Sequence, residues 1–180
     1  IQMKKPLLIL FALFIAINSF AQDQVKGKVI ENYGTTFSVP NPDFKTDTDL
    51  IFKVVFDIAK APENPADLNR YFNTVARFLN MHKNAGIPQE NLKPVMVVHG
   101  EAAMGLLKNE FYKEKYGVDN PNLDLLEALH AAQVPVILCG QTAGSKGLTK
   151  ENTWQYAQFA LSAMTALIQL QNDGYQLITF

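Results

Sequence analysis

Cys139 is the one cysteine of the chain and the residue best suited to covalent chemistry. It ends the apolar run 134–138 and precedes a glycine, a pattern typical of a buried strand that ends in a loop. Ligands gather at such strand ends in open α/β sheets. Because one thiol cannot form a disulfide within its own chain, three roles stay open: a packed apolar residue, a reactive thiol, or half of a bond to another molecule.

Two further residues that could take part in acid–base or ligand chemistry, His99 and Glu101, follow another apolar segment, 94–98. The carboxyl ends of parallel strands meet at one edge of a sheet, so we expect His99, Glu101 and Cys139 to share a pocket. A nearby imidazolium favours a thiolate, and so does a helix that starts after Gly140. Structural roles stay open as well, with His99 as a hydrogen-bonded histidine and Glu101 as a carboxylate at a helix N-terminus.

The residues after Cys139 complete the predicted site. We expect Gly140, Gln141 and Thr142, together with Glu101, to contact a ligand through a turn rich in backbone N–H groups. The stretch 140–147 departs from a phosphate-binding loop, since Ser145 stands where a second glycine belongs and Gly147 where a hydroxyl residue belongs. We therefore predict a flexible surface turn here and no nucleotide or flavin cofactor.

Metal binding has little support in the sequence. His99, Glu101 and Cys139 are suitable ligand types, but the chain contains no Cys-x₂-Cys or His-x₃-His pair. The other histidines, His82 and His130, fall on predicted helices and are expected at the surface. We predict neither a metal nor any other cofactor.

The charge balance argues against a nucleic-acid partner. The chain has 16 basic and 17 acidic residues, a formal net charge of −1, and no cluster of basic and aromatic residues. Proteins that bind nucleic acid need a basic surface to neutralise phosphates.

The N-terminal segment 1–21 has the pattern of a secretory signal. Lys4 and Lys5 precede the apolar stretch 6–17, and small residues at Ser19 and Ala21 favour cleavage after Ala21. The stretch is shorter than the roughly 20 residues of a spanning helix, although an uncleaved anchor is the alternative. We expect a periplasmic or secreted protein with no membrane contact after cleavage, whose lone thiol meets an oxidising environment.

The rest of the chain alternates strands and helices. Residues 22–49 read as an irregular arm, with a short hairpin within 25–37 and apolar side chains that pack on the domain or on a neighbouring subunit. The domain 50–180 has strands expected at 50–58, 94–99, 134–139 and 175–180, with helices at 64–84, 102–115 and after Asn120-Pro121. Residues 152–171 could form one helix, but we predict a short strand near 158–161 and a helix over 162–172. This order predicts a three-layer α/β/α domain with a mostly parallel five-stranded sheet.

These elements, in this order, resemble the DsrE/DsrF-like family, also called YchN-like. The resemblance covers roughly residues 50–180 and rests on the strand 53–58, the segment Val97-Val98-His99-Gly100, the stretch from Asn122 to Cys139-Gly140-Gln141-Thr142, and the segments 161–167 and 170–175. It implies the five-stranded parallel α/β/α fold, assembly as trimers or hexamers, and support for dividing residues 152–171.

The resemblance also implies a function, because sulfur-relay members of the family carry a persulfide on a cysteine in the place of Cys139. Those members work in the cytoplasm, whereas this chain has a predicted export signal. We expect an exported oligomer that works through Cys139, with His99 tuning it, on a small sulfur-containing ligand or a thiol partner. The alternative is a non-catalytic ligand-binding or structural oligomer in which Cys139 is buried.

Overall fold

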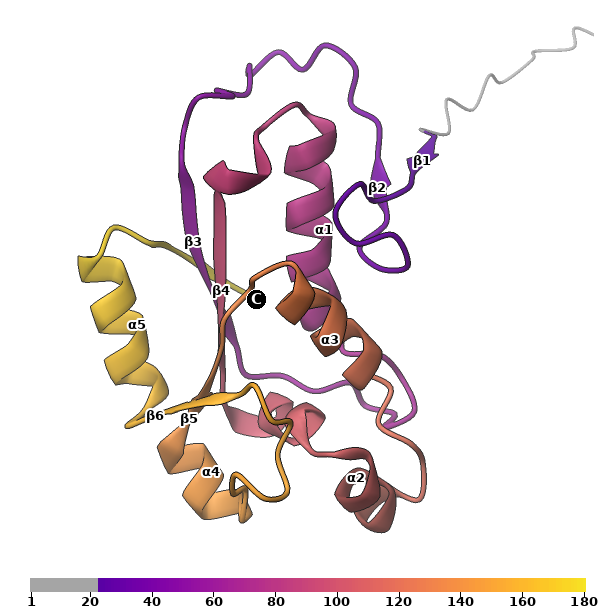
Figure 1. Ribbon diagram of the computed structural model, residues 1–180, viewed down its shortest axis with the longest axis vertical. Coiled ribbons are helices and arrows are strands. Elements are labelled where there is room, and N and C mark those ends of the chain that lie inside the picture. Colours follow the sequence, from indigo (N-terminus) through magenta and orange to yellow (C-terminus); the bar gives the residue numbers. More distant parts are fainter. Residues whose placement is uncertain (1–22) are drawn as a thin grey trace, which may run out of the picture.

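A twisted sheet of five parallel strands forms the centre of the structure (Figure 1). The computed structural model describes residues 23–180, so the secretory signal predicted for residues 1–21 lies outside the described residues. The strands lie in the order β6-β5-β4-β3-β7, and every neighbouring pair is parallel. Their bounds are β3 Phe52–Ile58, β4 Leu92–Val98, β5 Val136–Cys139, β6 Gln158–Ala160 and β7 Gln176–Thr179.

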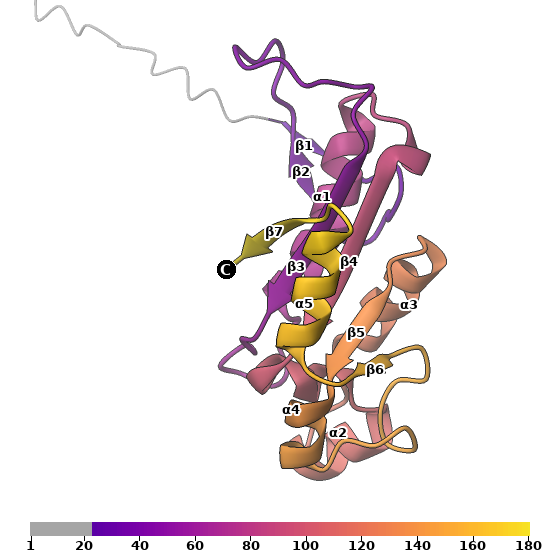
Figure 2. The same cartoon turned by 90° about the vertical axis from the view of Figure 1, so that its left-hand side faces the viewer.

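Helices cover both faces of this sheet and its carboxyl edge. α1 (Arg70–Asn84) and α3 (Leu123–Ala131) lie on one face, and α5 (Ala163–Asn172) lies on the other (Figures 1 and 2). Beyond the carboxyl ends of the central strands lie the short helices η2 (Gly100–Leu106), α2 (Asn109–Tyr116) and α4 (Gly140–Lys146), while η1 (Gln89–Asn91) precedes β4. The predicted three-layer α/β/α fold is confirmed. Within residues 23–180 no helix has the length and hydropathy to cross a membrane.

The two faces of the sheet carry cores of different size. The face under α1 and α3 belongs to a large cluster that includes Phe56, Phe72, Met96 and Leu126. The face under α5 has a small cluster of buried residues: Val55, Val97, Cys139, Ala163 and Ala166. Apolar burial contributes in proportion to area, so the α1 side supplies most of the hydrophobic stabilisation.

The arm is attached to the domain through the side chain of Asn80 on α1. The Oδ1 atom of Asn80 accepts hydrogen bonds from the N–H groups of Val29 and Ile30, and its Nδ2 atom donates to Ile30 O and Tyr33 O. Val29, Ile30 and Tyr33 pack on the large core, and β1 (Gln24–Val25) pairs antiparallel with β2 (Thr36–Phe37). The apolar residues Phe37, Val39 and Phe44 stay exposed, so only part of the arm packs on the domain.

Several element boundaries differ from those predicted. The first helix begins at Arg70 rather than near residue 64, because the buried Asn69 side chain accepts a hydrogen bond from Tyr71 N and caps the helix there. The helix expected directly after Asn120-Pro121 begins at Leu123. The prediction that residues 156–172 divide is confirmed, since β6 ends at Ala160 and α5 follows.

Two other predictions are wrong. Residues 140–147 are not a flexible surface turn, because 140–146 form helix α4 and Gly147 ends it with a positive φ of 68°. His82 is not a surface residue: it is half-buried between Phe52 and Phe78, and this burial lowers its pKa. His130 is exposed, as expected.

Candidate functional site

The thiol of Cys139 lies at the junction of β5 and α4 and caps the N-terminus of that helix. Its Sγ atom accepts a hydrogen bond from Thr142 N at 3.5 Å, the geometry of a side-chain N-cap. Cys139 can occupy this place because its backbone is still extended, with φ −62° and ψ 116°, while Gly140 already begins the helix. Only 5% of the residue surface is exposed, so the sulfur is largely shielded from solvent.

Two opposite effects act on the pKa of this thiol. Burial raises the pKa, because it disfavours the charged thiolate. Hydrogen bonds from the N–H and hydroxyl of Thr142 and from the N–H groups of Ala163 and Gln141 lower it. Together these donors prevail, and the pKa of Cys139 lies below the ordinary value for cysteine. The donors come from the starts of two helices, α4 and α5, so the site favours a sulfur anion.

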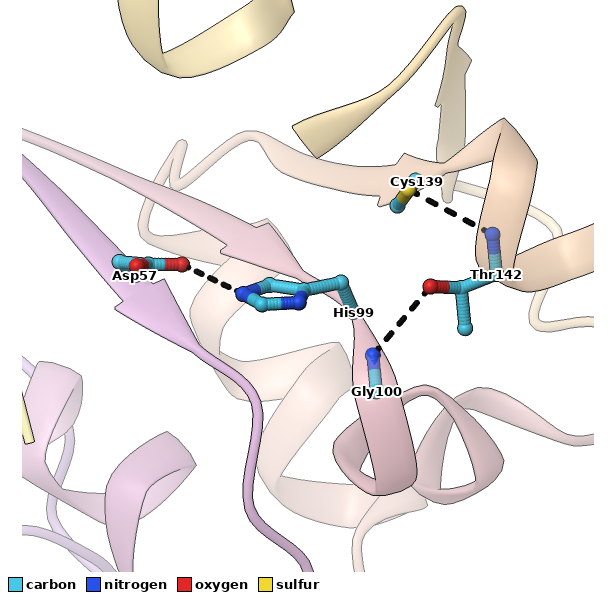
Figure 3. A network of polar contacts seen from close by, with 5 residues as sticks. All are labelled: Asp57, His99, Gly100, Cys139 and Thr142. Carbon is cyan, nitrogen blue, oxygen red and sulfur yellow. Dashed lines mark hydrogen bonds and ion pairs between the residues drawn. The ribbon is translucent and has the colours of Figure 1, made fainter. Parts of the chain in front are cut away.

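Thr142 connects the thiol to the neighbouring strand end. Its hydroxyl oxygen accepts a hydrogen bond from Gly100 N at 3.3 Å, as Figure 3 shows. Gly100 has a positive φ of 54°, and a Cβ atom there would lie 2.8 Å from Ala59 O. Glycine is therefore required at this turn, where the chain leaves β4 and enters η2.

His99 lies between Cys139 and the next strand of the sheet, but its ring is turned toward Asp57. The Nε2 atom of His99 is 2.7 Å from Asp57 Oδ1, and both side chains are partly buried (Figure 3). Within residues 23–180 no hydrogen bond joins the imidazole to the thiol. The groups that lower the pKa of the thiol are N–H and O–H donors, and His99 is not among them.

Glu101 forms a separate part of the carboxyl edge. Its Oε1 atom accepts a hydrogen bond from Lys146 Nζ at 2.6 Å, which joins η2 to the end of α4. Glu101 also lines a hollow of about 410 Å³ together with Lys60, Glu63 and Tyr116. Cys139, Gly140, Gln141 and Thr142 do not line this hollow, so Glu101 and the thiol face different spaces.

Gly140 and Gln141 hold α4 against the segment that links β6 to α5. A Cβ atom on Gly140 would lie 2.4 Å from Ala160 O, so only glycine allows this approach. The side-chain amide of Gln141 donates to Leu161 O at 3.2 Å. Two residues after Leu161, the N–H group of Ala163 donates to the sulfur.

The structure thus brings Cys139, Gly140, Gln141 and Thr142 together and places His99 directly after the adjacent strand, β4. Asp57, Lys146 and Ala163 were not anticipated from the sequence. Asp57 could have been noticed in the sequence, because it is a carboxylate within the otherwise apolar end of the segment 53–58. No feature of the sequence points to the Ala163 N–H group, because its position depends on how the start of α4 packs against the segment between β6 and α5.

Comparisons with known proteins concern the family and the fold. A model of the DsrE/DsrF-like family matches residues 53–180. The fold is similar to that of YchN from E. coli, at a TM-score of 0.53 and 20% identity over 72% of this chain and 99% of YchN. It is also similar to MTH1491 of Methanobacterium thermoautotrophicum, a protein of unknown function, at a TM-score of 0.52 and 16% identity with the same shares covered. No curated protein matches the chain. Because the family model spans most of the chain and both neighbours have its fold, the chain belongs to the DsrE/DsrF-like family.

Proposed function

We propose that this chain is an exported, self-associating member of its family that carries sulfur as a persulfide on Cys139. The observation that carries the proposal is the set of hydrogen-bond donors around Sγ, which lowers the pKa of a largely buried thiol. An anion held in this way is a nucleophile, and a terminal persulfide anion in the same place carries the same negative charge.

The proposed step is an exchange of sulfane sulfur with a low-molecular-weight persulfide. The Cys139 thiolate attacks the outer sulfur of the donor, and a bond forms between Sγ and that sulfur. The sulfur–sulfur bond of the donor breaks, and its electron pair leaves with the inner sulfur as a thiolate, which takes up a proton. The protein ends as a persulfide, the donor ends as a thiol, and no external oxidant is consumed.

The test is the intact mass of the protein after exposure to glutathione persulfide. We expect the added mass of one sulfur atom, its removal by reductant, and no gain in Cys139→Ser. Sulfide alone is the chemical control, because it cannot convert a reduced thiol to a persulfide without an oxidant. If the native protein gains no sulfur while the denatured protein does, the proposal is wrong.

The intact mass of the protein also tests whether the chain is exported and cleaved. Protein recovered from the periplasm of an expressing bacterium is expected to begin at Gln22, which follows the predicted cleavage site. A mass that retains residues 1–21 in that fraction counts against the exported form.

A second candidate function is ligand binding without chemistry at the sulfur. It is favoured by the 410 Å³ hollow beside Glu101 and by the 5% exposure of Cys139, which packs with Val55 and Val97. In that case the thiol is core packing, and Cys139→Ser costs stability because it buries a hydroxyl among apolar side chains. Slow native alkylation together with a lowered melting temperature of Cys139→Ser would decide for this second function.

A further inference from the structure

Asp57, His99 and Cys139 lie at the carboxyl ends of three adjacent strands, on one face of the sheet. Val55 on β3 and Val97 on β4 belong to the same buried cluster as Cys139. Side chains two residues apart on a strand point to the same face, so Asp57 and His99 also lie on the α5 face. The sheet order places His99 between the other two.

The register brings His99 next to Cys139. Val98 pairs with Ile58 on one side and with Leu138 on the other. His99 and Cys139 each follow one of the paired residues Val98 and Leu138, at an edge where neighbouring strands ordinarily lie about 5 Å apart. The carboxylate, imidazole and thiol therefore follow one another across the face, each on its own strand.

The contact with Asp57 determines where His99 carries its proton. A carboxylate only accepts hydrogen bonds, so the 2.7 Å contact requires a proton on Nε2. In the neutral ring the lone pair then lies on Nδ1. Within the described part of the chain, no protein group forms a hydrogen bond with Nδ1, and that nitrogen stays free to exchange protons.

We infer that Asp57 is a positioning residue that keeps the proton of His99 on Nε2 and leaves Nδ1 to relay a proton during sulfur exchange at Cys139. This inference rests on the proposed function. Nδ1 takes the proton of the Cys139 thiol, and the thiolate forms its bond to the outer sulfur of the donor. When the donor's sulfur–sulfur bond breaks, Nδ1 returns that proton to the departing thiolate. His99 ends in its original state, and the proton has moved from Cys139 to the donor.

The test is a double-mutant cycle on the rate of sulfur transfer from glutathione persulfide. We expect His99→Gln to lower the rate by about 100-fold and Asp57→Asn by roughly tenfold. If Asp57 acts through His99, Asp57→Asn has no further effect in the His99→Gln background, so the two changes are strongly non-additive. Asp173→Asn is the matched control, because Asp173 pairs with Lys53 at the amino edge of the sheet.

A spectroscopic measurement separates positioning from a merely structural role. In nitrogen-15 NMR spectra of the mature protein, neutral His99 is expected to show the Nε2–H tautomer, and Asp57→Asn is expected to change the tautomer ratio. Alkylation of Cys139 by iodoacetamide needs no relay and should stay within about twofold in Asp57→Asn, which shows that the thiol site is intact.

Each result has a distinct meaning. An effect of Asp57→Asn that persists in the His99→Gln background overturns the relay, and so does a wild-type ring protonated on Nδ1 alone. Sulfur uptake that neither change slows overturns the relay and leaves the proposed function standing. If the wild-type protein takes up no sulfur, the proposed function fails and the relay fails with it.

Discussion

Cys139 shows how a thiol can be both buried and activated. Apolar neighbours on the sheet would leave a lone thiol protonated, yet N–H groups from two helix starts and the hydroxyl of Thr142 prevail over them. Of these donors, the hydroxyl is the one that a substitution can remove without altering the backbone. It also accepts from Gly100 N, which aligns it on the sulfur.

Thr142→Val is expected to raise the pKa of Cys139 toward the ordinary value, because the isosteric side chain cannot donate. Near pH 7 the thiolate fraction then falls, and alkylation by iodoacetamide should slow by roughly threefold to tenfold. The measurement is the pH dependence of the alkylation rate, whose midpoint moves to higher pH. Thr165→Val is the control, since Thr165 bonds to Ser162 rather than to the thiol. Equal midpoints in Thr142→Val and wild type would show that the hydroxyl has no part in the effect.

At the scale of elements, the close approach of α4 to the segment after β6 holds the donors in place. Gly140 at the start of α4 lies against Ala160 O, the last carbonyl of β6, with no room for a Cβ atom. Backbone cannot yield as a flexible side chain does, so an added methyl must separate α4 from the start of α5. The N–H group of Ala163 would then move away from Sγ.

Gly140→Ala is therefore expected to destabilise the protein by about 1–3 kcal/mol and to slow alkylation of Cys139. Gly144→Ala is a matched control on the same helix, because nothing lies within 4 Å of the added methyl. There alanine should stabilise by about 0.5–1 kcal/mol through its higher helix propensity. Chemical denaturation of both variants gives the comparison, and equal stabilities would contradict the packing described for Gly140.

The sheet and its helices were predictable because strands and helices differ in hydrophobic period, and the family resemblance supported the division of 152–171 into β6 and α5. The helix over 140–146 was missed because Gly140, Gly144 and Gly147 suggest a turn, whereas the Cys139 cap and packing against β6 make it helical. The Asp57–His99 pair depends on strand order, and a single sequence does not specify which strands are neighbours.

At the scale of the whole molecule, the α5 face shows large apolar residues to solvent. Leu161, Met164 and Ile168 are 73%, 71% and 58% exposed, although Ala163 and Ala166 of the same segment are buried in the small cluster that holds the thiol. Exposed apolar groups of this kind mark interaction surfaces. We propose that a second copy of the chain covers them, in keeping with the trimers or hexamers that the family resemblance implies.

Ile168→Glu is expected to shift the mature protein toward monomer, because a carboxylate would be buried in the interface. Gln169→Glu, one residue further along α5 and also exposed, adds the same charge and should leave assembly unchanged. Light scattering at micromolar concentration measures the difference. A wild-type protein with the mass of one chain would rule out self-association.

The unequal cores of the two sheet faces also determine how a reagent reaches the sulfur. Detaching α5 exposes only the smaller cluster around Val55, Val97 and Cys139 and leaves the large cluster under α1 and α3 intact, so this opening is expected to cost less free energy than global unfolding. Such an opening would expose the thiol while the rest of the protein stays folded. The rate of its reactions under native conditions would then depend on how often α5 opens as well as on the thiolate fraction, and an assembly that holds α5 in place would slow sulfur exchange.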